Sequence, residues 1–256
     1  MARIVARKER HQLAFDIPVR DVANVSDYFC MAFGHRPVFI GGRAVNMLTG
    51  GETRPSHDID LVLAARPTPH QLEQLSFAPG RDGVYFSVDG NMRATLRPSI
   101  IYHSDTLPTK DKAVKIDMYY PGYVSPVNGL KPRNDINGIP IMDIVSGAET
   151  VNIGDTDFSV TNRATLMVMK YVTWTSRGKG KHDAKDMKDI IKLVSSGHEG
   201  IEWFRELVSE IEGVLNGSMS KERGKEILKG IMRDVGFERI NPAFGAYAKE
   251  ALRSGQ

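Results

Sequence analysis

Asp58 and Asp60 have the clearest chemical meaning in the sequence, because a single residue, Ile59, separates two carboxylates within an apolar run. On a strand, side chains alternate between the two faces, so both carboxylates project to one side and lie about 7 Å apart. Like charges at that separation repel unless a cation lies between them. Oxygen donors suit a hard divalent ion such as Mg²⁺. The pair predicts a metal site; the alternative is scattered acids on a solvent-facing edge strand.

Asp117 and the Gly41–Gly42 pair strengthen the metal interpretation. Asp117 stands between Ile116 and Met118, so its carboxylate is expected on the face opposite these apolar side chains. A third carboxylate on an adjacent strand would complete a cradle for two ions, one activating the attacking oxygen and one steadying the triphosphate. The glycines stand where a predicted strand meets a predicted helix, which lets the backbone approach a phosphate.

Rival phosphate and metal motifs fail on spacing. The run Gly178–Lys181 lacks the P-loop spacing and the Ser or Thr after the lysine, and no G-x-G-x-x-G occurs. The dipeptides His57-Asp58 and His182-Asp183 raise the alternative of a metal phosphohydrolase. That class needs ligands on helices, whereas His57 heads a strand-like segment and is interpreted as a solvated turn residue.

The elements that must position these residues follow from apolar periodicity and turn signals. The Gly-, Pro- and Asn-rich stretch 121–140 is expected to be a long irregular loop. Helices are expected at 21–35, 43–49, 68–75 and 141–147. Strands are expected at 37–40, 58–63, 84–88, 93–101, 113–120 and 151–160, with 84–88 and 93–101 forming a hairpin that makes the sheet mixed.

After Thr161 the pattern changes to amphipathic helices separated by Gly or Ser. These helices are expected at 162–176, 182–195, 199–215, 220–235 and 242–253. The fold class is therefore α/β (α+β): a mixed-sheet core over residues 1–160 is followed by a helical domain over residues 161–256.

Charge and composition set limits on partners. The 256 residues include 34 Lys and Arg against 31 Asp and Glu, a net charge of +3, which excludes a histone-like tail or a polybasic membrane binder. Residues 1–160 carry 17 basic and 18 acidic side chains, whereas residues 161–256 carry 17 and 13. The mildly basic second half allows a nucleic-acid partner without requiring one.

Cysteine usage and apolar run lengths indicate a soluble, cytoplasmic protein. Cys30 is the only cysteine, so an intrachain disulfide and Cys-based zinc sites are excluded, and it is interpreted as a buried core thiol. No stretch approaches the ~20 apolar residues that span a bilayer. The basic N-terminus lacks the apolar centre of a secretory signal, so no membrane association is expected.

The segments FIGGRAVNML (39–48) and RPSHDIDL (54–61) resemble a signature of the nucleotidyltransferase superfamily with the DNA polymerase β-like core. They are most similar to its minimal group, which includes the AbiEii and MenA-type toxins. The resemblance implies a nucleotidyltransferase core, phosphate contacts from Gly41 and Gly42, and metal binding by Asp58 and Asp60. It also assigns Arg43 and Ser56 to nucleotide binding, while Asp117 matches the third carboxylate by strand context.

A second patch resembles the same group in the helical half. Lys170 is followed by RGKGKHDAKD (177–186), similar to a lysine and an Arg-x-Lys-x-Arg-Asp-x-x-Asp motif, with His182 in place of the usual arginine. Lys170 would neutralise triphosphate charge, and Asp186 would hold Lys170 or position the incoming hydroxyl. The alternatives are a solvated helix with internal ion pairs, or an RNA-gripping segment, since residues 177–192 hold six Lys and Arg against three Asp.

These features predict an enzyme that moves a nucleoside monophosphate from an NTP to an acceptor hydroxyl and releases pyrophosphate, with Mg²⁺ (or Mn²⁺) bound by Asp58, Asp60 and Asp117. Asp117 is also a candidate general base. RNA, above all a tRNA 3′ end, is the expected acceptor; a protein or small molecule is the alternative. The group further implies an antitoxin partner. A non-catalytic nucleotide- or nucleic-acid-binding module is the contrasting hypothesis, but binding alone needs no cluster of three carboxylates.

Overall fold

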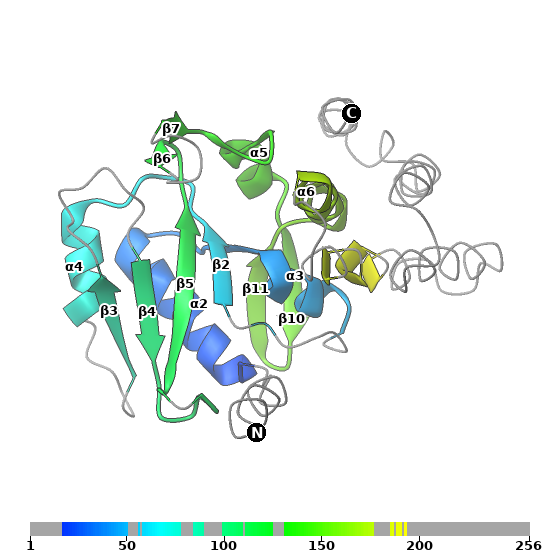
Figure 1. The fold of residues 1–256 in the computed structure, drawn as a ribbon. Coiled ribbons are helices and arrows are strands. Elements are labelled where there is room, and N and C mark those ends of the chain that lie inside the picture. The colour runs from blue at the N-terminus through cyan, green and yellow to red at the C-terminus, as the bar shows by residue number, and fades with distance from the viewer. Residues whose placement is uncertain are drawn as a thin grey trace, which may run out of the picture.

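The computed structural model describes residues 17–50, 56, 58–77, 84–89, 99–109, 111–124, 131–176, 185, 186, 188–190, 192 and 193. In this part of the chain a seven-stranded mixed sheet combines with helices (Figure 1). The predicted α/β class with a mixed sheet is therefore confirmed. The helices expected at 199–215, 220–235 and 242–253 lie outside the described residues, and the domain division after residue 160 stays a prediction.

The sheet has the strand order β10-β11-β1-β2-β5-β4-β3. β1 pairs in parallel with β11 and β2 in parallel with β5, whereas the remaining neighbours are antiparallel. The parallel pairing of β2 with β5 brings matching ends of two central strands together. The strands are β1 Val38–Ile40, β2 Asp58–Val62, β3 Tyr85–Asp89, β4 Ser99–His103, β5 Ala113–Tyr119, β10 Glu149–Ile153 and β11 Thr156–Val160.

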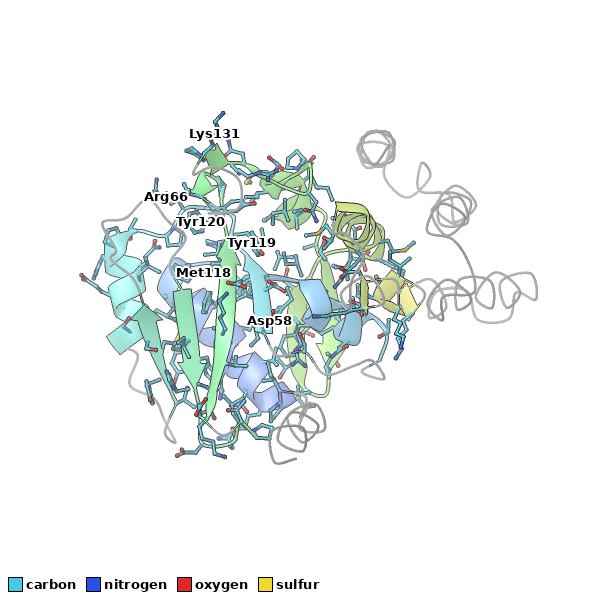
Figure 2. The ribbon with its side chains drawn as sticks, viewed as in Figure 1. Asp58, Arg66, Met118, Tyr119, Tyr120 and Lys131 are labelled. Carbon is cyan, nitrogen blue, oxygen red and sulfur yellow. The ribbon has the colours of Figure 1, made fainter. Side chains whose placement is uncertain are left out.

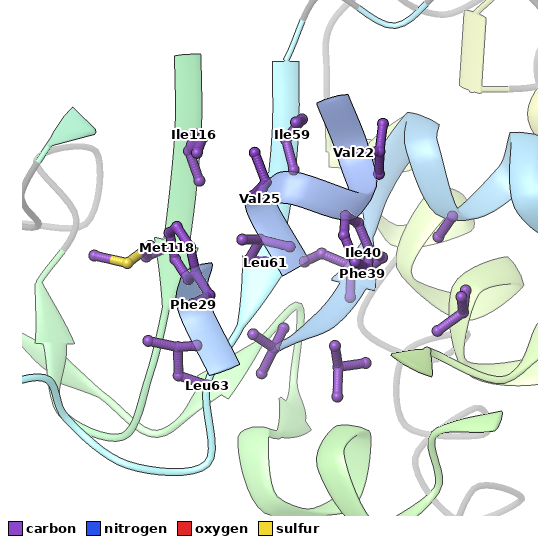
Figure 3. Close-up of a cluster of buried hydrophobic side chains, with 14 of the residues drawn as sticks. Val22, Val25, Phe29, Phe39, Ile40, Ile59, Leu61, Leu63, Ile116 and Met118 are labelled. Atoms are coloured by element: carbon purple, nitrogen blue, oxygen red, sulfur yellow. The ribbon is translucent and has the colours of Figure 1, made fainter. Parts of the chain in front are cut away.

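One face of this sheet is closed by α2 (Val19–Phe33) and α4 (Pro69–Phe77), which pack against each other and against the strands. Ile59 and Leu61 of β2 and Ile116 and Met118 of β5 are fully buried there, beside Phe29 of α2 (Figure 3). The aspartates between them are only half-buried. The predicted alternation of apolar and acidic side chains on β2 and β5 is thus confirmed.

The helix α2 differs slightly from the range 21–35 expected for it. It ends at Phe33 because Gly34 adopts a left-handed conformation, φ +76°, and donates its backbone N–H to the Cys30 carbonyl. Cys30 itself is a free thiol that is half-buried, so the expectation of a core thiol is wrong. It stands at the margin of the buried stripe that contains Val25 and Phe29.

The closed face also buries a carboxylate. Asp21, in the first turn of α2, is 0% exposed. It accepts hydrogen bonds from the Tyr102 hydroxyl at 2.7 Å and from the Thr106 hydroxyl at 2.7 Å. Burial raises the pKa of Tyr102, and its hydrogen bond to Asp21 raises that pKa further. This network ties α2 to β4 and the loop that follows it.

Two expectations for the second half of the core are wrong. The described residues of the stretch 121–140 include four short strands in two small sheets instead of only irregular loop, and residues 151–160 do not form one strand. Two-residue strands with Pro and Gly show no period-two pattern, and the turn at Gly154, φ +63°, divides β10 from β11. The short strands are β6 Tyr123–Val124, β7 Pro132–Arg133, β8 Asp135–Ile136 and β9 Ile139–Pro140.

The remaining helices agree with the predicted segments. They are α3 (Gly41–Leu48), α5 (Ile141–Ser146) and α6 (Arg163–Ser176), and α6 packs on α3. α3 begins at the first glycine, two residues before the expected start. α6 follows Asn162, whose side-chain oxygen caps it by accepting the Thr165 backbone N–H at 2.8 Å. Among the described helices, none combines the length and apolar character needed to cross a bilayer.

Candidate active site

The aspartates of β2 and β5 open onto a cavity of about 380 Å³. Its walls come from the centre of the sheet, the start of α3, the β6–β9 region, α6 and the described helical residues after it. In Figure 2, Asp58 lies near the middle of the sheet, and Tyr119 lies above it toward β6 and β7. Three segments that are far apart in the sequence therefore meet at one site.

All three predicted carboxylates line this cavity. Asp60 of β2 is the register partner of Asp117 of β5, and Asp58 is that of Lys115. Adjacent strands lie about 4.8 Å apart, so the carboxylates of Asp60 and Asp117 are neighbours on one face. The Lys115 ammonium lies 2.9 Å from Asp117 Oδ1, and Ser56 donates to Asp58 Oδ1 at 3.3 Å. The sheet thus concentrates negative charge at the cavity floor.

Gly41 fits this floor where no larger residue would. Its φ of +68° is strained for any side chain, and a Cβ at this position would lie 2.1 Å from Asp60 Oδ2. The glycine lets the backbone at the start of α3 come against the carboxylate. Gly41 and Gly42 both line the cavity, so the N-terminus of α3 faces into it beside Asp60. The predicted combination of glycines and aspartates is brought together by the fold.

Lys170 of α6 reaches the cavity from the side opposite the sheet and is 8% exposed. Its ammonium lies 3.5 Å from Asp186 Oδ1 and 2.6 Å from Asp189 Oδ2, and both aspartates are 2% exposed. The structure therefore brings Lys170 and Asp186 together, as the sequence predicts. Sequence reasoning missed Asp189, the nearer partner, although its three-residue spacing from Asp186 places both on one helix face.

The β6–β9 region forms a wall that sequence reasoning also missed. Tyr119 and Tyr123 stack edge to face at 5.3 Å, and the Tyr123 hydroxyl donates to the Asp135 carbonyl at 3.0 Å. Arg133 is ion-paired with Asp135 and donates a hydrogen bond to its carboxylate. This hydrogen bond raises the pKa of the guanidinium, which keeps it charged. Asn137 joins the wall to α6 by donating to the Met169 carbonyl at 3.0 Å. The aromatic and basic residues in 119–137 are the sequence feature from which this wall could have been predicted.

A cavity floor of carboxylates, a helix N-terminus and a lysine match what nucleotidyl transfer needs, and comparison with known proteins agrees. The family model described as "Nucleotidyl transferase AbiEii toxin, Type IV TA system" matches residues 29–213. The chain belongs to this family. It is therefore a nucleotidyltransferase of the toxin class of type IV toxin–antitoxin systems.

The chain is also similar to solved structures of nucleotidyltransferase-like proteins. An antigenic nucleotidyltransferase-like protein from Paracoccidioides brasiliensis is 14% identical, with 89% of this chain and 90% of that chain covered and a TM-score of 0.50. The nucleotidyltransferase toxin MenT4 from Mycobacterium tuberculosis is 14% identical over 92% of both chains, with a TM-score of 0.43. At 14% identity the likeness to the Paracoccidioides brasiliensis protein concerns the fold alone. No curated protein matches the chain.

Two predicted nucleotide contacts of this AbiEii-family protein lie away from the cavity. Arg43 is 4% exposed and lines a second cavity of about 450 Å³ between α2, α3 and the β10–β11 turn. Successive helical residues point about 100° apart, so Arg43 cannot face the same way as Gly41. Ser56 is buried and donates to Asp58, a position from which it orients the carboxylate.

The carboxylates of the AbiEii-family site fit a hard divalent ion by their chemistry. Asp58, Asp60 and Asp117 offer only oxygen donors on adjacent strands. Among the described residues, however, no three His, Cys, Asp or Glu side chains converge into a ready metal site. Asp117 is turned to Lys115, whose side chain is 53% exposed. A divalent ion at these carboxylates would compete with the Lys115 ammonium for Asp117.

Proposed function

We propose that this nucleotidyltransferase transfers a nucleoside monophosphate from an NTP to the 3′-terminal hydroxyl of an RNA, with tRNA as the main candidate, and releases pyrophosphate in a Mg²⁺-dependent reaction. The observation that carries the proposal is that Asp58, Asp60 and Asp117 share one cavity with the N-terminus of α3. A cation-binding floor beside a phosphate-binding helix end is the arrangement that phosphoryl transfer requires.

The chain's own groups would hold the triphosphate from two sides. The backbone at Gly41 and Gly42 would approach its phosphates at the positive end of α3. Lys170, Lys185 and Arg133 line the same cavity and would offset the remaining negative charge. Asp189, at 2.6 Å, and Asp186, at 3.5 Å, fix the position of the Lys170 ammonium.

Asp58, Asp60 and Asp117 would hold the divalent ions, Mg²⁺ or Mn²⁺, which supply Lewis-acid stabilisation of the phosphate charge when bound. The acceptor hydroxyl oxygen attacks the α-phosphorus, and the bond from that phosphorus to the bridging oxygen breaks. Pyrophosphate leaves with the bonding electron pair. We assign the proton of the hydroxyl to Asp117, because its half-buried carboxylate on β5 lines the cavity floor.

RNA is the acceptor that the charge distribution favours. Residues 161–256 carry 17 basic and 13 acidic side chains, and six of the basic ones lie within 177–192, next to the cavity-lining Lys170 and Asp186 in sequence. A polyanionic strand gains from such a surplus. We place the enzyme in the cytoplasm, where NTP and RNA are available, and expect an antitoxin to restrain it.

The test is transfer of label from each α-labelled NTP to total RNA and total protein, with the wild-type chain, Asp60→Asn and Asp27→Asn. Asp60→Asn keeps the shape of the side chain but removes its charge, and transfer should fall about a thousandfold. Asp27 is exposed on α2, so its variant should retain wild-type transfer. Undiminished transfer by Asp60→Asn, or labelling of protein instead of RNA, would contradict the proposal.

A further inference from the structure

The face of the sheet that carries the cavity aspartates continues past β5 across β4 and β3. Cross-strand register places Lys115 beside Ile101 and Ile101 beside Ser87, and in the next row Ala113 beside His103 and His103 beside Tyr85. Alternate residues of a strand share a face, so these side chains lie on the same side as Asp117. We call Lys115, Ile101, Ser87, His103 and Tyr85 the outer platform.

The outer platform is open, in contrast to the opposite face of the same strands. Tyr85 is 52% exposed and the Lys115 side chain 53%, whereas Phe86, Ile100 and Tyr102 on the opposite face are buried. In Figure 1, β3, β4 and β5 stand in front of α2, and none of the described helices crosses before them. Among the described aromatic residues, Tyr85 is the one with a largely exposed side chain.

Tyr85 and His103 form a preorganised aromatic pair. Their ring centroids are 4.2 Å apart and the rings are inclined by only 7°. The His103 Nε2 is within 3.0 Å of the Ser87 hydroxyl, which holds the imidazole in place. Burial lowers the pKa of His103, which favours the neutral form of the ring. A flat aromatic stack with an exposed tyrosine is the kind of surface on which an unpaired base stacks.

The direction from which the acceptor arrives follows from in-line transfer, and this step rests on the proposed function. The leaving pyrophosphate would lie toward the N-terminus of α3 beside Asp60 on β2, as argued above. Attacking and leaving oxygens lie on opposite sides of the phosphorus. The acceptor hydroxyl must therefore enter from the side of Asp117 on β5, beyond which β4 and then β3 follow in the sheet.

We propose that the outer platform binds the single-stranded 3′ end of the acceptor RNA. A base upstream of the terminal nucleotide stacks on Tyr85, backed by His103, and the phosphate backbone passes Lys115 on its way to the cavity. Tyr85 lies two β-strands away from Asp117 and four residues further along the strand direction, which is about 17 Å in all. A single RNA strand can span this distance and so contact both the outer platform and the reacting centre.

Two measurements on the full chain test the outer platform: the KM for an RNA acceptor, and the affinity for a labelled single-stranded RNA ending in CCA, followed by fluorescence anisotropy. Tyr85→Ala should raise both the KM for RNA and the dissociation constant about tenfold. The KM for NTP should stay at the wild-type value. Tyr85→Phe keeps the ring and should restore both RNA parameters to within about twofold of wild type.

Met31→Ala is the matched control, since Met31 is 70% exposed but lies on α2, behind the sheet. It should leave every parameter unchanged. An unaltered KM and affinity for RNA in Tyr85→Ala would overturn the outer platform while the proposed function stands. If wild-type chain labels no RNA, the proposed function fails, and anisotropy alone then decides whether RNA binds here. Labelling of protein that depends on Tyr85 would overturn RNA as the occupant.

Discussion

Carboxylates on the two faces of the sheet differ in their burial and in the groups that hold them. On the closed face, Asp21 is 0% exposed and is held by the hydroxyls of Tyr102 and Thr106, each at 2.7 Å. On the open face, Asp117 is held by Lys115, a surface lysine that is 53% exposed. A buried donor fixed by packing, such as the Tyr102 hydroxyl, stabilises a fold, whereas an exposed lysine is screened by solvent and is easily exchanged for another cation. The acid on the closed face is therefore structural, and those on the open face suit a bound cation.

The largest effect should come from Gly41→Ala, which changes only the open face of the sheet. The new Cβ would lie 2.1 Å from Asp60 Oδ2 and would occupy a residue with φ +68°. Asp60 or the start of α3 must shift, and nucleotidyl transfer should fall about a hundredfold to a thousandfold. Gly34→Ala is the matched control, since Gly34 also has a positive φ, +76°, but meets no atom within 4 Å.

Both glycine variants should lose about 1 kcal/mol of unfolding free energy from backbone strain, measured by urea titration. Only Gly41→Ala should lose transfer activity beyond its loss of folded protein. Equal transfer by the two variants would show that close approach of α3 to Asp60 is irrelevant to the reaction.

A smaller effect, and on stability instead, should follow from Asp21→Ala. Removing this carboxylate leaves the buried Tyr102 hydroxyl without its acceptor, whereas Thr106 is exposed and its hydroxyl keeps its contact with Ser104. The unfolding free energy should drop by about 3 kcal/mol in a urea titration. Asp27→Ala, exposed on the same helix, should change it by less than about 0.5 kcal/mol.

The rate of transfer per folded molecule of Asp21→Ala should equal that of wild type, assayed below the temperature at which it unfolds. A large loss of turnover in fully folded Asp21→Ala would mean that the two faces are not independent.

The smallest effect is a pH dependence on the closed face. The pKa of Tyr102 is raised, first by burial, above its ordinary value of 10.0. A group whose pKa is raised by folding stabilises the native state below its unfolded pKa. That contribution is lost as pH rises above about 10, because the unfolded chain then releases a proton that the folded chain retains. Tyr102→Phe should abolish this part of the alkaline loss of stability in urea titrations between pH 9 and 11. If the unfolding free energy of Tyr102→Phe falls with pH as steeply as that of wild type, this role of Tyr102 is contradicted.

The sequence was sufficient for those parts of the site where a local pattern dictates geometry. Strand alternation places Asp58, Asp60 and Asp117 on one face, and glycines at a strand–helix junction place the start of α3 beside them. The pairing of β2 with β5 and the register of Asp60 with Asp117 are tertiary facts that no local pattern specifies. The strand character of Asp117 was predictable, but its position beside Asp60 required the fold.

Other features could not be predicted because their causes are not local. Arg43 lies one residue past the glycines, yet helix geometry turns it into a different cavity. Asp189 contacts Lys170 only because α6 and the described residues that follow it are close in space. The wall containing Tyr123 and Asn137 consists of two-residue strands and the turns between them, which are too short for a period to show.

The assembly of the cavity has a consequence for synthesis of the enzyme. Gly41 and Asp60 are synthesised first, Asp117 and Asn137 next, and Lys170 and Asp186 last. A growing chain on the ribosome therefore lacks one wall of its own cavity until the segment that contains Asp186 has been made. For an enzyme whose proposed acceptor is tRNA, a nascent chain would carry the carboxylate floor before it carries the wall that closes the cavity.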